Sequence, residues 1–215
     1  DMKISKEKLL LKEHNKAIVF LMFLFLGITL SFVTWYVFLP SETTNIVFDK
    51  QTSTIQAINN KVSGNAFIQF SVFTKILLNN IKVLAFATLF AFIYGAGAIF
   101  ILTWNASVIG AAIGNFIRSN ISEYASAIGL SQFSNYFSVV SIGLLKYSLH
   151  GIPEMLAYFY GGLAGGIISI AIIKEHYKSE KFAHIVFDIS ELLIISLSFL
   201  LIAALIEVYI TPILF

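Results

Sequence analysis

Long apolar runs separated by short polar segments dominate the chain. The first run extends without interruption from 17 to 39, and its roughly 23 residues are enough to cross a hydrocarbon core of about 30 Å as a helix. The hydrophobic pattern predicts four further crossings, which cover 81–103, 106–117, 137–173 and 189–210. The predicted fold class is therefore all-α, a polytopic membrane helical bundle with about five transmembrane spans.

Two of these regions depart from a simple span. The run 106–117 has only about a dozen residues, so we interpret it as a short crossing and keep a re-entrant segment as the alternative. In the fourth region we predict a broken helix at His150-Gly151. Glycine loosens a helix there, and Pro153 cannot donate a backbone hydrogen bond. This region is either one kinked span or a half-helix followed by a new helix.

Polar segments follow the first span. The longest of them, 41–64, is expected to be an external loop. In residues 65–78 apolar side chains recur at helical spacing between polar ones, which is typical of an amphipathic interfacial helix at the outer surface. Asn79 and Asn80 would then mark the turn into the second span.

Composition places the chain in a membrane. Of its 215 residues, 58% are hydrophobic and 12% are charged, against about 25% charged in soluble domains, and the mean hydropathy is +0.85. We expect a cytoplasmic N-terminal segment, 1–16, and a single transmembrane helical domain, 17–215, surrounded by the lipid bilayer. The lysine-rich residues 3–16 predict a multipass protein of the cell membrane with a cytoplasmic N-terminus. The net charge of +2 gives no reason to expect nucleic acid as a partner, and the absence of cysteine excludes disulfides and thiolate metal sites.

Ionisable side chains lie inside the fourth apolar region. Lys146, His150 and Glu154 are spaced four residues apart, so a continuous helix would place them on one face. A charged group at bilayer depth costs about 2.5–3.5 kcal/mol on insertion scales and therefore needs a partner or water. Glu207, deep in the last apolar run, is the partner that we expect to reach the His150 segment.

Our first interpretation of this polar centre is structural. A hydrogen-bonded pair of His150 and Glu154 would determine how two helix ends pack, while Lys146 either joins it or extends along its stem to the outer surface. The functional alternatives are a proton relay or a cation site. A metal needs more ligands than His-x-x-x-Glu supplies, and no Gly-x-Ser-x-Gly nucleophile motif is present. We therefore expect no metal, no cofactor and no catalytic residue.

Glycines and asparagines mark further positions that we expect at helix contacts and helix ends. Glycines one helical turn apart predict close helix contacts within one chain, with a homodimer as the alternative; they are Gly110 and Gly114, Gly161 and Gly165, and Gly162 and Gly166. Asn79, Asn80 and Asn105 lie near the ends of apolar runs, where we expect them to cap helices or to hydrogen-bond to the His150 segment.

Two groups of motifs surround the polar centre. They are His150-Gly151-Ile-Pro-Glu154-Met-Leu-Ala157 with Gly161-Gly-Leu-Ala-Gly165-Gly, and, earlier, Asn79-Asn80-Ile-Lys-Val-Leu-Ala, Gly95-Ala-Gly97 and Trp104-Asn105-Ala-Ser-Val-Ile-Gly110. These motifs resemble the stage II sporulation protein M family of integral membrane proteins. The resemblance implies a multipass protein of scaffold type, whose sporulation member works with peptidoglycan hydrolases at the septum.

These observations predict a non-enzymatic membrane protein that scaffolds or organises a complex, with membrane or envelope proteins as partners. The alternative is a transporter or channel-like protein that uses the polar centre of His150 and Glu154, because broken helices and buried polar groups are common in such proteins.

Overall fold

The computed structural model describes residues 2–59, 66–94, 98–123, 130–175 and 182–214, and its regular elements there are all helical. They are α1 (Met2–Phe38), α2 (Ser41–Val47), α3 (Asp49–Asn59), α4 (Ala66–Tyr94), α5 (Ala98–Glu123), α6 (Leu130–Ile173), α7 (Phe182–Leu205), the π-helical turn η2 (Ile206–Ile210) and α8 (Thr211–Leu214). The prediction of an all-α fold is confirmed for this part of the chain.

Five stretches are long and apolar enough to cross a membrane. They are Lys16–Phe38 in α1, Gln69–Tyr94 in α4, Ile99–Ile121 in α5, Phe137–Ile173 in α6 and Phe182–Leu214 in α7 with η2 and α8. The predicted five-span polytopic bundle is therefore confirmed. The last span is longer at both ends than the expected run 189–210.

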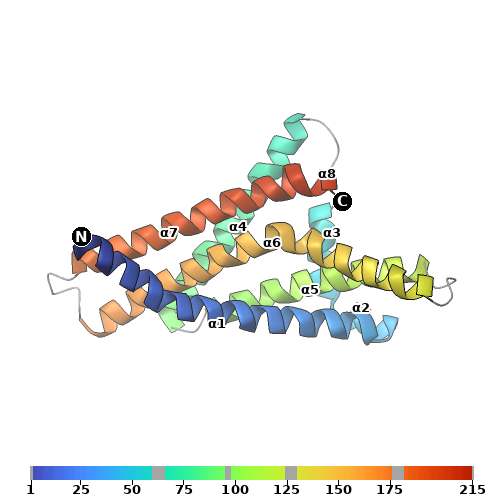
Figure 1. Ribbon diagram of the computed structural model, residues 1–215, viewed down its shortest axis with the longest axis horizontal. Coiled ribbons are helices and arrows are strands. Elements are labelled where there is room, and N and C mark those ends of the chain that lie inside the picture. Colours follow the sequence, from blue (N-terminus) through green and yellow to red (C-terminus); the bar gives the residue numbers. More distant parts are fainter. Residues whose placement is uncertain (1, 60–65, 95–97, 124–129, 176–181, 215) are drawn as a thin grey trace.

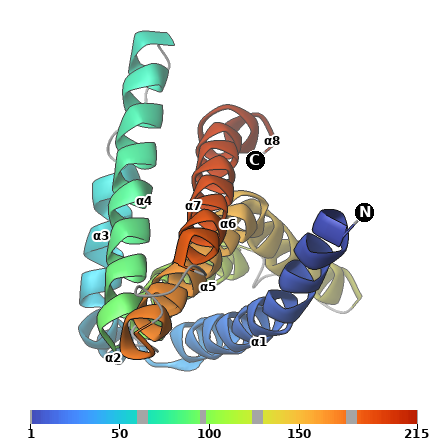
Figure 2. The same ribbon diagram turned by 90° about the vertical axis from the view of Figure 1, so that its left-hand side faces the viewer.

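The helices pack around α6. This helix lies against α7, α4 and α5, while α1 packs mainly on α5. Figure 1 shows α1, α5, α6 and α7 extending along the long dimension of the molecule, with α4 inclined to them. In Figure 2 the first part of α4 projects beyond the other helices. The main buried cluster lies where these helices meet and includes Leu84, Ala106, Tyr158, Phe159 and Leu200.

The boundary between the second and third spans differs from the prediction. The expected span 81–103 is divided, because α4 ends at Tyr94 and α5 begins at Ala98. The intervening residues, including Gly95 and Gly97, lie outside the described part of the chain. The run 106–117 is the middle of the 26-residue helix α5, whose stretch Ile99–Ile121 is long and apolar enough for a full crossing.

The segment expected to be an external loop is largely helical, since it contains α2 and α3. Between them Phe48 is only 1% exposed and packs against Tyr36 and Phe32 of α1, with ring centroids 4.9 and 6.2 Å away. This buried aromatic side chain helps to attach a mainly polar segment to the bundle. The hydrophobic pattern did not reveal this because the apolar patch at 46–48 is so short.

The helix predicted at 65–78 is not a separate interfacial element. Residues 66–78 form the first part of α4, which continues through Asn79 and Asn80 without a turn, while residue 65 lies outside the described part of the chain. Both asparagines therefore lie in a helix interior. Asparagine lowers helix stability only slightly, unlike proline, so it does not have to end a helix.

The predicted break at His150-Gly151 is a bend within a continuous helix. Pro153 lies inside α6, and no new helix begins there. Figure 1 shows the bend near the middle of α6. Because Pro153 has no N–H to donate to the Leu149 carbonyl, one bond of the helix is lost on this turn. Of the two sequence-based alternatives, the structure shows the single kinked span.

Candidate functional site

One face of α6 carries a series of polar side chains. The hydroxyl group of Tyr158 donates a 2.8 Å hydrogen bond to Oε1 of Glu154, one turn earlier. Tyr158 is completely buried, so this contact lies inside the bundle. Sequence reasoning missed Tyr158, although its position continues the four-residue spacing of Lys146, His150 and Glu154.

Glu207 comes to this site from the last span. It lies in η2 and interacts electrostatically with Glu154 and with Tyr158. The antiparallel packing of α6 and α7 explains the meeting, because the stacked rings of Tyr160 and Phe199, 5.9 Å apart, hold these two helices in register. The structure thus brings together Glu154 and Glu207. A π-helical turn widens the helix at Glu207, and such turns are frequent at functional sites.

The two carboxyl groups have no basic partner among the described residues. Lys146 is engaged elsewhere, because its Nζ lies 5.6 Å from the ring centroid of Phe116 in α5. Two neighbouring carboxylates repel strongly in a medium of low dielectric constant. Sharing a proton or binding a cation would relieve this repulsion, and these are the chemical possibilities of the arrangement.

His150 does not form the predicted pair with Glu154. No hydrogen bond joins them in the described structure, and Nδ1 of His150 is buried without a hydrogen-bond partner there. Glu154 accepts its hydrogen bond from Tyr158 instead, one turn further along α6. Gly151, next to His150, is buried and faces Ile109 of α5, whose Cδ1 would lie 3.7 Å from an added Cβ.

The three predicted asparagines differ in how far they are buried. Asn80 is 6% exposed and lies one turn before Leu84, on the α4 face that meets α6, whereas Asn79 is exposed. In α5 the side chain of Asn105 donates a 2.9 Å hydrogen bond to the Ile101 carbonyl. None of the three caps a helix end, so the capping prediction was wrong. Leu84 lies against Gly161 and Thr88 against Gly165, and this register places Asn80 at the level of Ala157, about one turn from Glu154.

Four of the six predicted glycines, Gly110, Gly114, Gly161 and Gly165, lie at close helix crossings within the chain. An added Cβ would be 2.6 Å from the Cβ of Phe32 at Gly110 and 2.6 Å from that of Tyr36 at Gly114. At Gly161 and Gly165 it would overlap Leu84 and the Thr88 carbonyl oxygen, respectively, in α4. Gly162 is buried, and an added Cβ at Gly166 would meet no atom within 4 Å.

A second polar network connects the ends of two spans. The Arg118 guanidinium group donates to the carbonyl oxygens of Tyr36 and Leu39 at 3.4 and 3.1 Å, to Oγ1 of Thr44 at 3.1 Å and to Oγ of Ser41 at 2.7 Å. A cation is favourable at the C-terminal end of a helix, where carbonyl groups lack helical partners. Arg118 of α5 thereby joins the end of α1 to α2.

Five candidate spans packed around an internal polar centre define a multipass membrane protein. The family model described as stage II sporulation protein M matches residues 16–212, nearly the whole chain, and the chain therefore belongs to that family. The match extends well beyond the motifs that suggested the family. No curated protein and no solved structure matches the chain.

Proposed function

We propose that the protein is a non-enzymatic scaffold of the cell membrane that organises a complex of membrane or envelope proteins, with its N-terminus in the cytoplasm. The observation that carries this proposal is the projecting first part of α4, which extends beyond the helices on which its second part packs (Figure 2). A helix end that projects beyond its own bundle offers a surface to a partner helix. Membership of the stage II sporulation protein M family, for which the resemblance implied a multipass protein of scaffold type, supports the same role.

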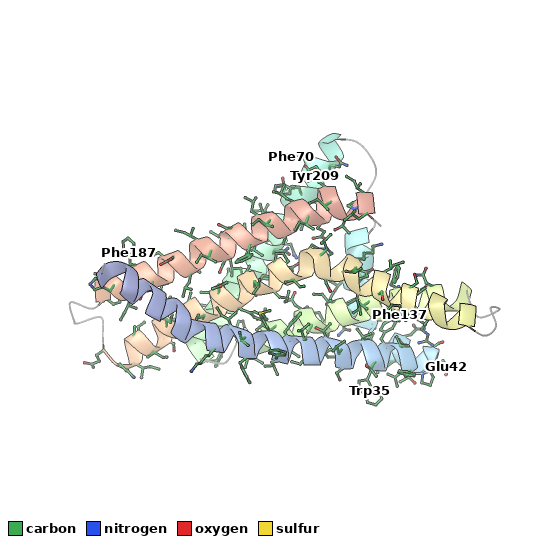
Figure 3. All side chains as sticks on the ribbon, viewed as in Figure 1. Trp35, Glu42, Phe70, Phe137, Phe187 and Tyr209 are labelled. Carbon is green, nitrogen blue, oxygen red and sulfur yellow. The ribbon has the colours of Figure 1, made fainter. Side chains whose placement is uncertain are left out.

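The projecting part of α4 has the side chains that such a contact needs. Phe70 is 65% exposed and lies towards the free end of the helix (Figure 3). Phe73 of the same helix packs against Tyr209 of η2, and their ring centroids are 6.4 Å apart. Exposed aromatic side chains on a supported helix are the kind of residue that dominates many protein interfaces.

Replacing Phe70 with alanine is expected to weaken the association with the partner roughly tenfold or more, because a buried aromatic anchor contributes about 2 kcal/mol or more to an interface. Crosslinking from a photoreactive residue at position 70 in native membranes, together with the size of the complex, measures the effect. Phe86→Ala is the matched control, since Phe86 lies in the packed part of the same helix and is 54% exposed. Equal effects at the two positions, or crosslinks to lipid alone from position 70, would exclude this contact surface.

The carboxyl pair favours a second candidate function, transport of protons or small cations. Membrane-embedded acidic residues frequently mark ion pathways. In this case vesicles containing the purified protein should conduct protons or a monovalent cation, and Glu207→Gln or Glu154→Gln should reduce the flux by about tenfold or more. Glu191→Gln, which changes an exposed acid of α7, is the control. Wild-type vesicles with no flux above that of empty vesicles would remove this candidate.

A further inference from the structure

The polar helix α3 is attached to the middle of a membrane span. Nε2 of Gln51 donates a 3.2 Å hydrogen bond to Oγ of Ser107 in α5. Arg118 marks the end of α1, and Ser107 precedes it by about 11 residues, which is roughly 16 Å along a helix. Trp35 and Glu42 lie together near this end of α1 (Figure 3), and Trp35 is 59% exposed, as is typical of a membrane interface. The attachment point is therefore well inside the span.

The packing of α5 on α6 provides an independent estimate of how deep Ser107 lies in the membrane. Ile109 faces Gly151, and Phe116 faces Gly143, so the two helices run antiparallel in a defined register. In this register Ser107 lies at the level of Glu154. The start of α3 is consequently as deep in the membrane as the polar centre.

The residues of α3 do not suit acyl chains. The helix has the sequence Asp49-Lys-Gln-Thr-Ser-Thr-Ile-Gln-Ala-Ile-Asn59. The side chains of Asp49 and Lys50 are 62% and 82% exposed and 3.5 Å apart, and Ser53 is also exposed. Hydrocarbon cannot solvate such groups, so charged side chains at membrane depth face protein or a water-filled space. Figure 1 shows α3 running across the direction of α1, so its polar side chains do not simply extend to the membrane surface along a span.

We propose that α3 borders a water-filled recess, open on the face of the membrane where α1 ends, which reaches the depth of the polar centre. The recess would bring the external solution to within one helix of Glu154. This inference rests on depth and charge and is independent of the scaffold proposal, because it does not involve the projecting part of α4.

The absence of native cysteine allows a direct test of water access. Lys50→Cys and Ser53→Cys are introduced separately, and the intact protein in sealed vesicles is exposed to a sulfonated maleimide, which cannot cross lipid, from either side. Maleimides react with thiolates, which form in water and not in hydrocarbon. Leu30→Cys is the control: Leu30 is 54% exposed on α1, and Gly110 contacts the neighbouring Thr29 at nearly the depth of Ser107.

We expect positions 50 and 53 to react from one side only, about tenfold faster or more than position 30. Labelling after denaturation confirms that each thiol is present. Unreactive thiols at 50 and 53 in the vesicles would overturn the proposal, because lipid or another protein chain would then cover α3. Equal reactivity at position 30 would also overturn it, because α1 would then not be surrounded by lipid at this depth. Neither result depends on the Phe70 experiment.

Discussion

Replacement of Gly165 by alanine should destabilise the folded bundle by about 1–3 kcal/mol, a typical penalty for overpacking. The added Cβ would overlap the carbonyl oxygen of Thr88, which belongs to the backbone of α4 and cannot rotate away. The helices α4 and α6 would have to separate, with loss of packing along the whole contact. Unfolding of the purified protein in detergent, followed by circular dichroism, measures the change.

Gly166→Ala is the matched control for this prediction. It introduces the same methyl group one residue later, where no atom lies within 4 Å, so stability should change little. Gly161→Ala should have an intermediate effect, because its obstacle is the flexible end of the Leu84 side chain. If Gly166→Ala lowered the stability as much as Gly165→Ala, the effect would come from the helix itself and not from the contact with α4.

Replacement of Arg118 by alanine should cost about 2–3 kcal/mol, because a charged donor that serves several acceptors contributes more than a neutral one. The carbonyl oxygens of Tyr36 and Leu39 would lose their side-chain donor, and α2 would lose its contacts through Ser41 and Thr44. Detergent unfolding and proteolysis near residue 41 measure the two consequences.

Arg118→Lys separates charge from geometry. A lysine retains the positive charge near the end of α1 but lacks the planar group that reaches all four acceptors, so it should restore only part of the stability. Lys82→Ala, which removes an exposed cation from α4, serves as the control. Full recovery with lysine would show that the helix end requires charge alone.

Prediction from sequence succeeded for the long apolar runs and failed at their boundaries. A run of about 20 apolar residues identifies a span, since each residue adds a similar gain on transfer to lipid. Asn105 looked like the boundary between the second and third spans, yet it lies inside α5 and its side chain donates to the Ile101 carbonyl within the helix. Similarly, Asn79 and Asn80 looked like a turn but lie inside α4.

The polar centre was only partly predictable. Helical spacing was enough to place His150 and Glu154 on one face of α6, and the unusual depth of Glu207 drew attention to it. The Tyr158 contact was missed because a tyrosine in an apolar run is ordinarily a core residue. That this hydroxyl group, and not His150, bonds to Glu154 depends on side-chain orientation in the packed bundle.

The sequence by itself determined that this chain is a helical membrane protein of the stage II sporulation protein M family, because apolar length and a local motif are properties of contiguous residues. The tertiary structure alone decided that α3 returns to the middle of α5, that Arg118 joins the ends of α1 and α2, and that Glu207 lies within electrostatic range of Glu154. These contacts join residues far apart in the chain. The free energy that stabilises them depends on how the helices pack against one another. It therefore cannot be read from the hydrophobicity of each segment.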